Sequence, residues 1–136
     1  MPEVKSMKLV FAMLSALVIA ATSTIPVFPH EQSNAECNDL TCNVDIIGQD
    51  EPYYSSKEIA VKKGATIVFE NHDSVMHTVT STKATYDENN PEEDGRFNSP
   101  LLKSGDSYLI QLNEEGEYNY FCQVHPWMRG KVTVIG

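Results

Sequence analysis

From residue 42 onward the chain is a series of short segments in which apolar residues alternate with polar ones or cluster together. Thr, Val, Ile, Tyr and Phe dominate these segments, and these residue types suit half-buried strands. Gly, Pro, Asn and Asp separate the segments, with turn signals at Lys63-Gly64 and Glu115-Gly116. The pattern predicts strands at about residues 42–47, 57–62, 65–71, 77–82, 106–113, 117–122 and 131–135.

Roughly seven short strands at this spacing are typical of a β-sandwich with Greek-key connections. Neither an internal repeat nor a long amphipathic helix is visible after the N-terminal segment. The sequence therefore predicts an all-β fold, a Greek-key sandwich of about seven to eight strands formed by residues 37–136. At 136 residues the chain is long enough for one such domain and hardly for two.

The first residues follow a different pattern. Lys5 and Lys8 precede the uncharged run LVFAMLSALVIAA, and small residues come after it. This order describes a secretory signal peptide, and the run is shorter than the roughly 20 residues of a membrane-spanning helix. We expect residues 1–23 to be a signal peptide, or alternatively a membrane anchor through residues 9–25, and residues 24–36 to be a linker. Either way, we expect an exported domain, periplasmic, secreted or held on the outer side of the cell membrane.

The charge of the chain narrows the classes of partner. The formal net charge is −9, which argues against nucleic acid, because phosphate contacts need clustered Lys and Arg. An acidic protein instead attracts basic partners. The stretch YDENNPEEDGR, residues 86–96, carries five acidic groups. We interpret it as a solvated surface loop, with a docking patch for a basic redox partner as the alternative.

The chain contains three cysteines. Export implies an oxidising compartment, and Cys37 and Cys42 are close enough to form a disulfide there. The alternative is that both are free or bind a metal. If they pair, Cys122 remains as an odd cysteine, and a thiolate bound to a metal would explain it.

Cys122 belongs to the run YFCQVHPWMRG, in which a cysteine, a histidine and a methionine follow one another at intervals of three residues. A helical stripe, a redox thiol with incidental neighbours and a set of metal ligands are all compatible with that spacing. Strand patterns on both sides leave room only for a loop, which can turn Cys122, His125 and Met128 toward one point. A thiolate, an imidazole and a thioether without a carboxylate suit copper, and they are unusual for zinc, magnesium or calcium.

A trigonal copper site with two histidines, one cysteine and a weak axial methionine needs a second histidine. His30 lies in the expected linker, and His72 stands among turn-forming residues. His77 begins the alternating segment HTVT, where a strand can hold it rigidly. We therefore favour His77 over His72.

The two motifs together resemble those of a known family. N-x-D-x-x-x-H-T-V, from Asn71 to Val79, is followed 45 residues after its histidine by Cys-x₂-His-x₂-Met. This constellation is similar to that of the type 1 (blue) copper proteins of the cupredoxin superfamily. FNSPLLKSGDSYLIQL and GEYNYFCQVHPWMRGKVTV also resemble the plastocyanin/amicyanin branch, which includes halocyanin-like exported proteins. The resemblance covers about residues 42–136, and implies a cupredoxin-like sandwich with one type 1 copper ion.

The resemblance implies that His77, Cys122 and His125 are the strong in-plane ligands and that Met128 is the long axial one. Many relatives have Asn directly after the first histidine ligand, where this chain has Thr78. We expect the threonine hydroxyl to make a similar bracing bond with less reach.

Amicyanins tend to have proline where this chain has Val124, and a proline has no N–H. We hypothesise that the backbone N–H groups of Thr78 and Val124 both point at the Cys122 sulfur. Hydrogen bonds there would stabilise the thiolate and tune the reduction potential.

Four protein ligands leave no vacant position for a substrate, so we expect an electron carrier and no enzyme. The copper ion would cycle between Cu(II) and Cu(I) and pass single electrons between exported or membrane redox proteins in transient contacts, and we expect a monomer. The resemblance implies that the His125 edge reaches the surface within an apolar patch that includes Met76, Pro126 and Trp127. For Trp127, packing against the end of the sandwich is the alternative.

Two other functions deserve comparison. A copper-binding or delivery protein is the main alternative, but such carriers often use Met- or His-rich tracts, and the chain has none. An oxidase or nitrite-reducing enzyme of the same superfamily needs further copper centres, which His30 and His72 do not easily supply.

Overall fold

The computed structural model describes residues 35–37, 40–83 and 89–136. This part of the chain forms nine strands and no helix, so it contains no helix long and apolar enough to cross a membrane. The strands are β1 (Ala35–Cys37), β2 (Thr41–Ile46), β3 (Glu58–Lys62), β4 (Thr66–Asn71), β5 (Thr80–Thr82), β6 (Glu93–Asn98), β7 (Ser107–Gln111), β8 (Gly116–Phe121) and β9 (Arg129–Ile135).

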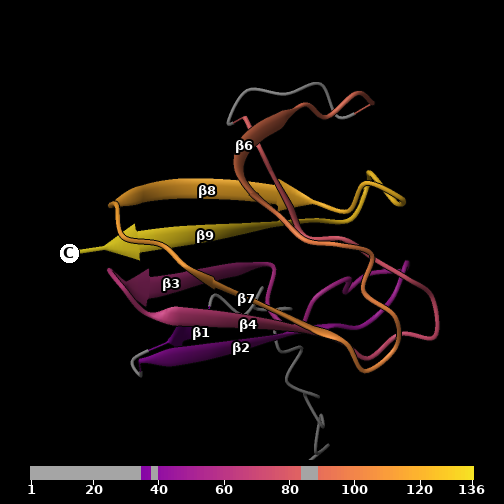
Figure 1. Cartoon of the computed structure of the whole chain (residues 1–136), viewed down its shortest axis with the longest axis horizontal. Helices are drawn as coiled ribbons and strands as arrows, with labels where there is room; N and C mark the ends of the chain where they lie inside the picture. Colours follow the sequence, from indigo (N-terminus) through magenta and orange to yellow (C-terminus); the bar gives the residue numbers. More distant parts are fainter. Residues whose placement is uncertain (1–34, 38–39, 84–88) are drawn as a thin grey trace, which may run out of the picture.

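The strands form two sheets that pack as a β-sandwich (Figure 1). One sheet has six strands in the order β1-β3-β9-β8-β5-β6, and the other has three in the order β2-β4-β7. The pairs β1–β3, β3–β9 and β2–β4 are parallel, and the remaining pairs are antiparallel. The predicted all-β sandwich is confirmed.

The alternating pattern of the sequence reappears as alternating burial along the strands. In β2 and β4 every second residue is buried, and the same holds for the middle of β9. The ring of Tyr120 lies edge-on against Tyr54 and Phe69, with ring centroids 5.1 and 5.2 Å away, and all three side chains are buried. Full burial of a purely apolar side chain such as Phe69 stabilises the fold by about 1.5–3 kcal/mol.

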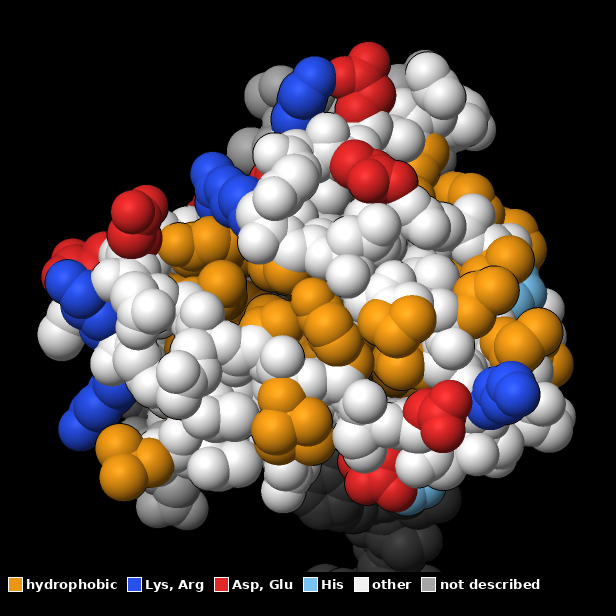
Figure 2. Space-filling model, in the orientation of Figure 1, with side chains coloured by type: hydrophobic (Ala, Val, Ile, Leu, Met, Phe, Trp, Pro, Cys, Tyr) orange, Lys and Arg blue, Asp and Glu red, His pale blue; other side chains and the backbone are white. Residues whose placement is uncertain are grey.

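Some apolar side chains remain on the surface. In the view of Figure 2 they spread across the face and gather at the end of the molecule where the loops after β4 and β8 lie in Figure 1. The turns at the opposite end connect β3 to β4 and β7 to β8. In this view, exposed apolar side chains therefore gather at the end of the sandwich that carries the loops after β4 and β8.

Two strands were not predicted. Residues 35 and 36, assigned to the end of the linker at 24–36, belong to β1, which pairs with β3. Residues 93–96 of the supposed loop at 86–96 belong to β6, which pairs with β5. The strand expected at 77–82 is shorter, because regular pairing begins at Thr80. The signal peptide or anchor expected at 1–23, and the rest of the linker, lie outside the described residues.

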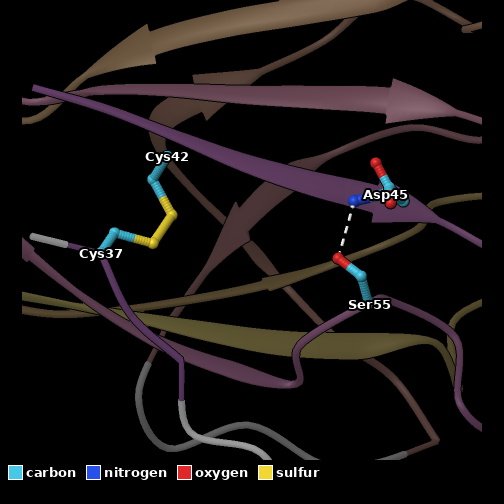
Figure 3. The surroundings of a disulfide bond; sticks show 4 residues. All are labelled: Cys37, Cys42, Asp45 and Ser55. Atoms are coloured by element: carbon cyan, nitrogen blue, oxygen red, sulfur yellow. Dashed lines mark hydrogen bonds between the residues drawn. A yellow bond between two sulfur atoms is a disulfide. The ribbon is translucent and has the colours of Figure 1, made fainter. Parts of the chain in front are cut away.

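The two sheets are joined by a disulfide between Cys37 and Cys42 (Figure 3). Cys37 ends β1 of the six-stranded sheet, and Cys42 lies in β2 of the three-stranded sheet. Their Cα atoms are 5.5 Å apart, within the ordinary range for a disulfide. The predicted pairing is confirmed, and Cys122 is the free, buried cysteine of the described residues.

Candidate metal centre

The loop between β8 and β9 is closed by strand pairing on both sides. Phe121 and Arg129 face each other in the β8–β9 register, so residues 122–128 form a tight connection at the end of the sandwich. Its shape is set by three backbone hydrogen bonds: His125 N–H to Cys122 O (3.2 Å), Met128 N–H to His125 O (2.9 Å) and Cys122 N–H to Met128 O (3.1 Å). The spacing of three residues therefore comes from successive turns in a loop, as the flanking strand patterns predicted.

His77 reaches the same end of the sandwich from the loop between β4 and β5. Its backbone pairs with Leu102 in an isolated bridge, with His77 N–H to Leu102 O at 3.1 Å and Leu102 N–H to His77 O at 2.8 Å. The side chain is fully buried. A single bridge, rather than a regular strand, thus fixes the position of this histidine.

Three donor atoms converge at this point. The Cys122 Sγ lies 3.7 Å from the Nδ1 of His77 and 3.7 Å from the Nδ1 of His125, and the two Nδ1 atoms are 3.2 Å apart. These three residues form the one group of this kind in the described part of the chain whose donor atoms could hold a metal ion. The separations match those of donors that each lie about 2 Å from a single ion.

The types of donor fit copper. Two imidazole nitrogens and a thiolate are the in-plane set of a trigonal copper site, and a nearby thioether supplies its weak axial position. Met128 follows His125 by three residues and is fully buried in the same loop. Burial lowers the pKa of His125, the neighbouring His77 lowers it further, and Asp73 acts in the opposite direction. The lowered pKa favours the neutral imidazole, which is the form that binds a metal.

The other two histidines lie elsewhere. His72 is half-exposed beside two carboxylates, with its Nε2 3.4 Å from Asp45 and 3.6 Å from Glu70. It does not belong to the group formed by His77, Cys122 and His125. His30 lies outside the described residues.

Thr78 contacts the cysteine and its loop. The Thr78 N–H donates to the Cys122 Sγ at 3.3 Å, as hypothesised. Its hydroxyl oxygen accepts the Gln123 N–H at 2.8 Å, so the threonine makes a bracing bond of the kind expected. The second hypothesised donor is wrong: within the described residues no hydrogen bond joins the Val124 N–H to this sulfur, and the Val124 side chain is half-exposed.

Sequence reasoning missed Asp73. Its Oδ2 lies 2.8 Å from the Nε2 of His77, on the side of the ring that faces away from Cys122. The hydrogen bond with His77 is the main reason that the pKa of Asp73 is lowered, and the backbone N–H groups of Ser74 and Val75 contribute. The available signal was the spacing of four residues between Asp73 and His77 in the N-x-D-x-x-x-H motif.

Trp127 connects the metal-site loop to a neighbouring loop. Its indole N–H donates to the Gln49 carbonyl at 3.0 Å, and its ring lies edge-on to His125 with centroids 5.3 Å apart. Half of its surface is nevertheless exposed, as are comparable shares of Met76 and Val124. The tryptophan therefore packs against the end of the sandwich and also contributes to the apolar surface near His125.

The acidic groups of β6 and the preceding turn make contacts within the domain. Glu92 pairs with Lys83, and the Glu93 side chain contacts Gln123. Asp94 accepts a hydrogen bond from Ser81. These contacts favour a structural role for the described part of the run at 86–96; residues 84–88 lie outside the described residues.

Comparison with known proteins agrees with this chemistry. Residues 40–135 match the model of the copper-binding proteins of the plastocyanin/azurin family. The chain is 31% identical over 96 residues to an amicyanin from Paracoccus versutus, covering 71% of this chain and 68% of the relative. It is 32% identical over 100 residues to an amicyanin from Paracoccus denitrificans, covering 74% of this chain and 70% of that relative.

A solved structure is similar as well. The purple cupredoxin from Nitrosopumilus maritimus superposes with a TM-score of 0.60 at 31% sequence identity. The match covers 69% of this chain and 99% of that structure. The similarity therefore extends over the sandwich as a whole and is not confined to the metal-site loop.

Proposed function

Because the chain belongs to the plastocyanin/azurin family of copper-binding proteins, we propose that it is a single-electron carrier. Its cofactor is one copper ion, and the type of site is that of the cupredoxins. In this role the ion would alternate between Cu(II) and Cu(I) while the protein passes single electrons between redox partners. The observation that carries the proposal is the convergence of two imidazole nitrogens and a thiol sulfur at the loop end of the sandwich.

We assign the ligands from this convergence. The Nδ1 atoms of His77 and His125 and the Sγ of Cys122, which converge, would hold the copper ion together with the thioether of the buried Met128. The Cys122 Sγ lies at the same distance, 3.7 Å, from the Nδ1 atoms of His77 and His125, which supports a single ion shared by all three donors.

The same arrangement argues for electron transfer rather than substrate chemistry. Catalytic metal sites keep an open coordination position, and four protein ligands would leave none here. His77, Cys122 and Met128 are fully buried, so a substrate has no direct access to them. Ligands held by strand pairing and loop hydrogen bonds also change little between oxidation states, which favours rapid transfer.

We propose that the electron leaves through the His125 edge. This side chain is partly exposed, whereas His77 is not. Exposed apolar groups of Met76, Val124 and Trp127 provide a small surface of the kind that transient redox encounters use. The net charge of −9 favours a basic partner, which the carrier would meet as an exported monomer.

Visible and electron paramagnetic resonance spectra of the copper-loaded protein test the proposal. We expect an intense visible absorption band and a small copper hyperfine splitting, because the thiolate of Cys122 would bind Cu(II). Cys122→Ser should lose the intense band. A wild-type copper complex without this band would contradict the carrier and leave copper binding or delivery as the better interpretation.

A further inference from the structure

We propose that Asp73 is a positioning residue that fixes the ring of His77 and places a negative charge behind it. The inference rests on the proposed function, because it takes His77 as a copper ligand. Asp73 does not reach the donor atoms that face Cys122; it contacts the opposite nitrogen of the ring. Its effect on the metal site would therefore pass through His77.

The geometry determines which nitrogen of His77 carries the proton. An ionised carboxylate only accepts hydrogen bonds, so the 2.8 Å contact between Asp73 Oδ2 and Nε2 requires an Nε2–H donor. In the neutral ring the other nitrogen, Nδ1, then has a free lone pair. That nitrogen is the one 3.7 Å from the Cys122 Sγ, so the carboxylate prepares His77 to bind a metal before any metal arrives.

Asp73 is itself held in place. Its backbone N–H donates to Asn71 Oδ1 at 2.9 Å, and its Oδ1 accepts the Ser74 N–H at 2.7 Å. The buried Asn71 amide in turn donates to the carbonyls of Val75 (2.8 Å) and Leu102 (2.9 Å). Leu102 also pairs with the backbone of His77. The carboxylate, the loop and the histidine are thus one connected hydrogen-bond network.

The carboxylate is poorly solvated, and this gives its charge a longer reach. The Asp73 side chain is 16% exposed, and the His77 side chain that it contacts is fully buried. Charges in such positions are screened much less than charges at the surface. Reduction adds one electron to the site, so an anion behind His77 disfavours reduction and lowers the potential.

Asp73→Asn and Asp45→Asn form a matched pair for the test. The asparagine at 73 keeps the shape and can still accept from Nε2–H, but it removes the charge. Asp45 also lies beside a histidine, at 3.4 Å from His72, but both of these side chains are about half-exposed. The Asp45 variant therefore measures the effect of losing one screened surface charge.

The reduction potential of the copper-loaded full-length protein is the first measurement. Asp73→Asn should change the ratio of reduced to oxidised protein at a given potential at least threefold toward the reduced form. At 59 mV per tenfold change for a one-electron couple, this is a rise of about 28 mV. Asp45→Asn should give a clearly smaller rise. Equal shifts in the two variants, or no shift at Asp73, would overturn the proposed charge effect.

The second measurement uses the copper-free protein. Nitrogen-15 NMR should show His77 in the Nε2–H tautomer in the wild type and in a mixture of tautomers in Asp73→Ala. An Nδ1–H tautomer in the wild type would overturn the positioning role. A colourless wild-type copper complex would instead contradict the proposed function, and the tautomer would still decide the role of Asp73.

Discussion

At the scale of single residues, Thr78 is the residue that braces the metal-site loop. Its backbone N–H donates to the Cys122 sulfur, and its hydroxyl oxygen accepts the Gln123 N–H. The hydroxyl also lies 3.1 Å from that of Thr80. One residue therefore contacts the sulfur and also holds the loop that carries it.

Thr78→Val tests this brace. Valine has the same shape, so the change removes the acceptor of Gln123 while the N–H to the sulfur remains. The change removes the hydroxyl bonds to both Gln123 and Thr80, so we expect the copper-free protein to lose about 1–3 kcal/mol of unfolding free energy, two hydrogen bonds at about 0.5–1.5 kcal/mol each, as measured by urea titration.

Thr133→Val is the control for this change. Thr133 lies half-buried in β9, and its side chain makes no hydrogen bond within the described residues. If both variants unfold at the same urea concentration as the wild type, the hydroxyl of Thr78 does not stabilise the loop.

The residues of the site differ in how far the sequence could predict them. Cys122 and His125 were predicted from the chemistry of their side chains, and His77 was preferred over His72 for its strand pattern and the family motif; the structure brings these three together. Asp73 was missed because its contact depends on the path of the loop between Asn71 and His77, which no pattern of apolar residues encodes. The prediction that the Val124 N–H points at the Cys122 sulfur was wrong for a similar reason, because it depends on the path of the loop between β8 and β9.

At the scale of elements, the unpredicted strands are the two at the edges of the six-stranded sheet. β6 exposes most of its residues, and β1 comprises three residues. An edge strand forms because its neighbour offers free backbone groups, so its own sequence need not alternate. The alternation of apolar residues therefore predicted the strands that bury one face, but it did not predict the two edge strands of the six-stranded sheet.

The disulfide at the edge joins β1 to β2, and its removal gives a second prediction. Replacing both Cys37 and Cys42 by serine should reduce the unfolding free energy by about 2 kcal/mol, the value that loop-closure entropy gives for so short a loop. Urea titration measures the loss, and a reductant should destabilise the wild type but not the variant. Equal stability of variant and wild type would show that other contacts hold β1.

Gly130 gives a prediction about the pairing of β8 with β9. It faces Tyr120 in the register, and a Cβ at this position would collide with the ring and hydroxyl of the tyrosine. The ring is fully buried and cannot move aside without disturbing the core. Gly130→Ala should therefore cost about 1–3 kcal/mol of unfolding free energy, as overpacked cores do.

Gly48→Ala is the matched control for this substitution. A Cβ there would meet Asp73 Oδ2 at 3.8 Å, an ordinary van der Waals contact. We expect its urea midpoint to stay near that of the wild type. A Gly130 variant as stable as the Gly48 variant would show that Tyr120 has room to shift.

At the scale of the whole molecule, the sequence predicted the sandwich but not the order of its strands. Alternation tells which face of a strand is buried, and it is silent about the neighbour that the strand pairs with. The parallel pairings of β3 with β9 and of β2 with β4 join segments far apart in the chain. Only packing of the complete core selects them, and in that core the ring of Tyr120 packs against Tyr54 and Phe69.

Tyr120 links this core to the stability of the protein at alkaline pH. Its hydroxyl is buried without a hydrogen-bond partner in the described part of the chain, and burial raises its pKa well above 10.0. As the pH rises past that ordinary value, the unfolded chain releases the tyrosine proton and the folded chain keeps it. The folded state then binds more protons, so its stability falls with pH.

Lys131 acts in the same direction. Ion pairs with Glu58 and Glu117 raise its pKa above 10.5, so the unfolded chain also loses this proton first. Tyr120→Phe removes only the contribution of the tyrosine. Between about pH 9 and pH 11 the unfolding free energy of the variant should therefore fall less steeply than that of the wild type. The decrease that is due to Lys131 should remain.

Removal of the unpaired hydroxyl should also stabilise the folded protein at neutral pH, where we expect Tyr120→Phe to gain about 1–3 kcal/mol of unfolding free energy. Urea titrations of the copper-free protein across this pH range measure both effects, with Tyr108→Phe, a half-buried tyrosine of β7, as the control. If the unfolding free energy of Tyr120→Phe falls with pH as steeply as that of the wild type, the tyrosine does not limit alkaline stability. A loss of stability at neutral pH would show that the hydroxyl makes a favourable contact in solution.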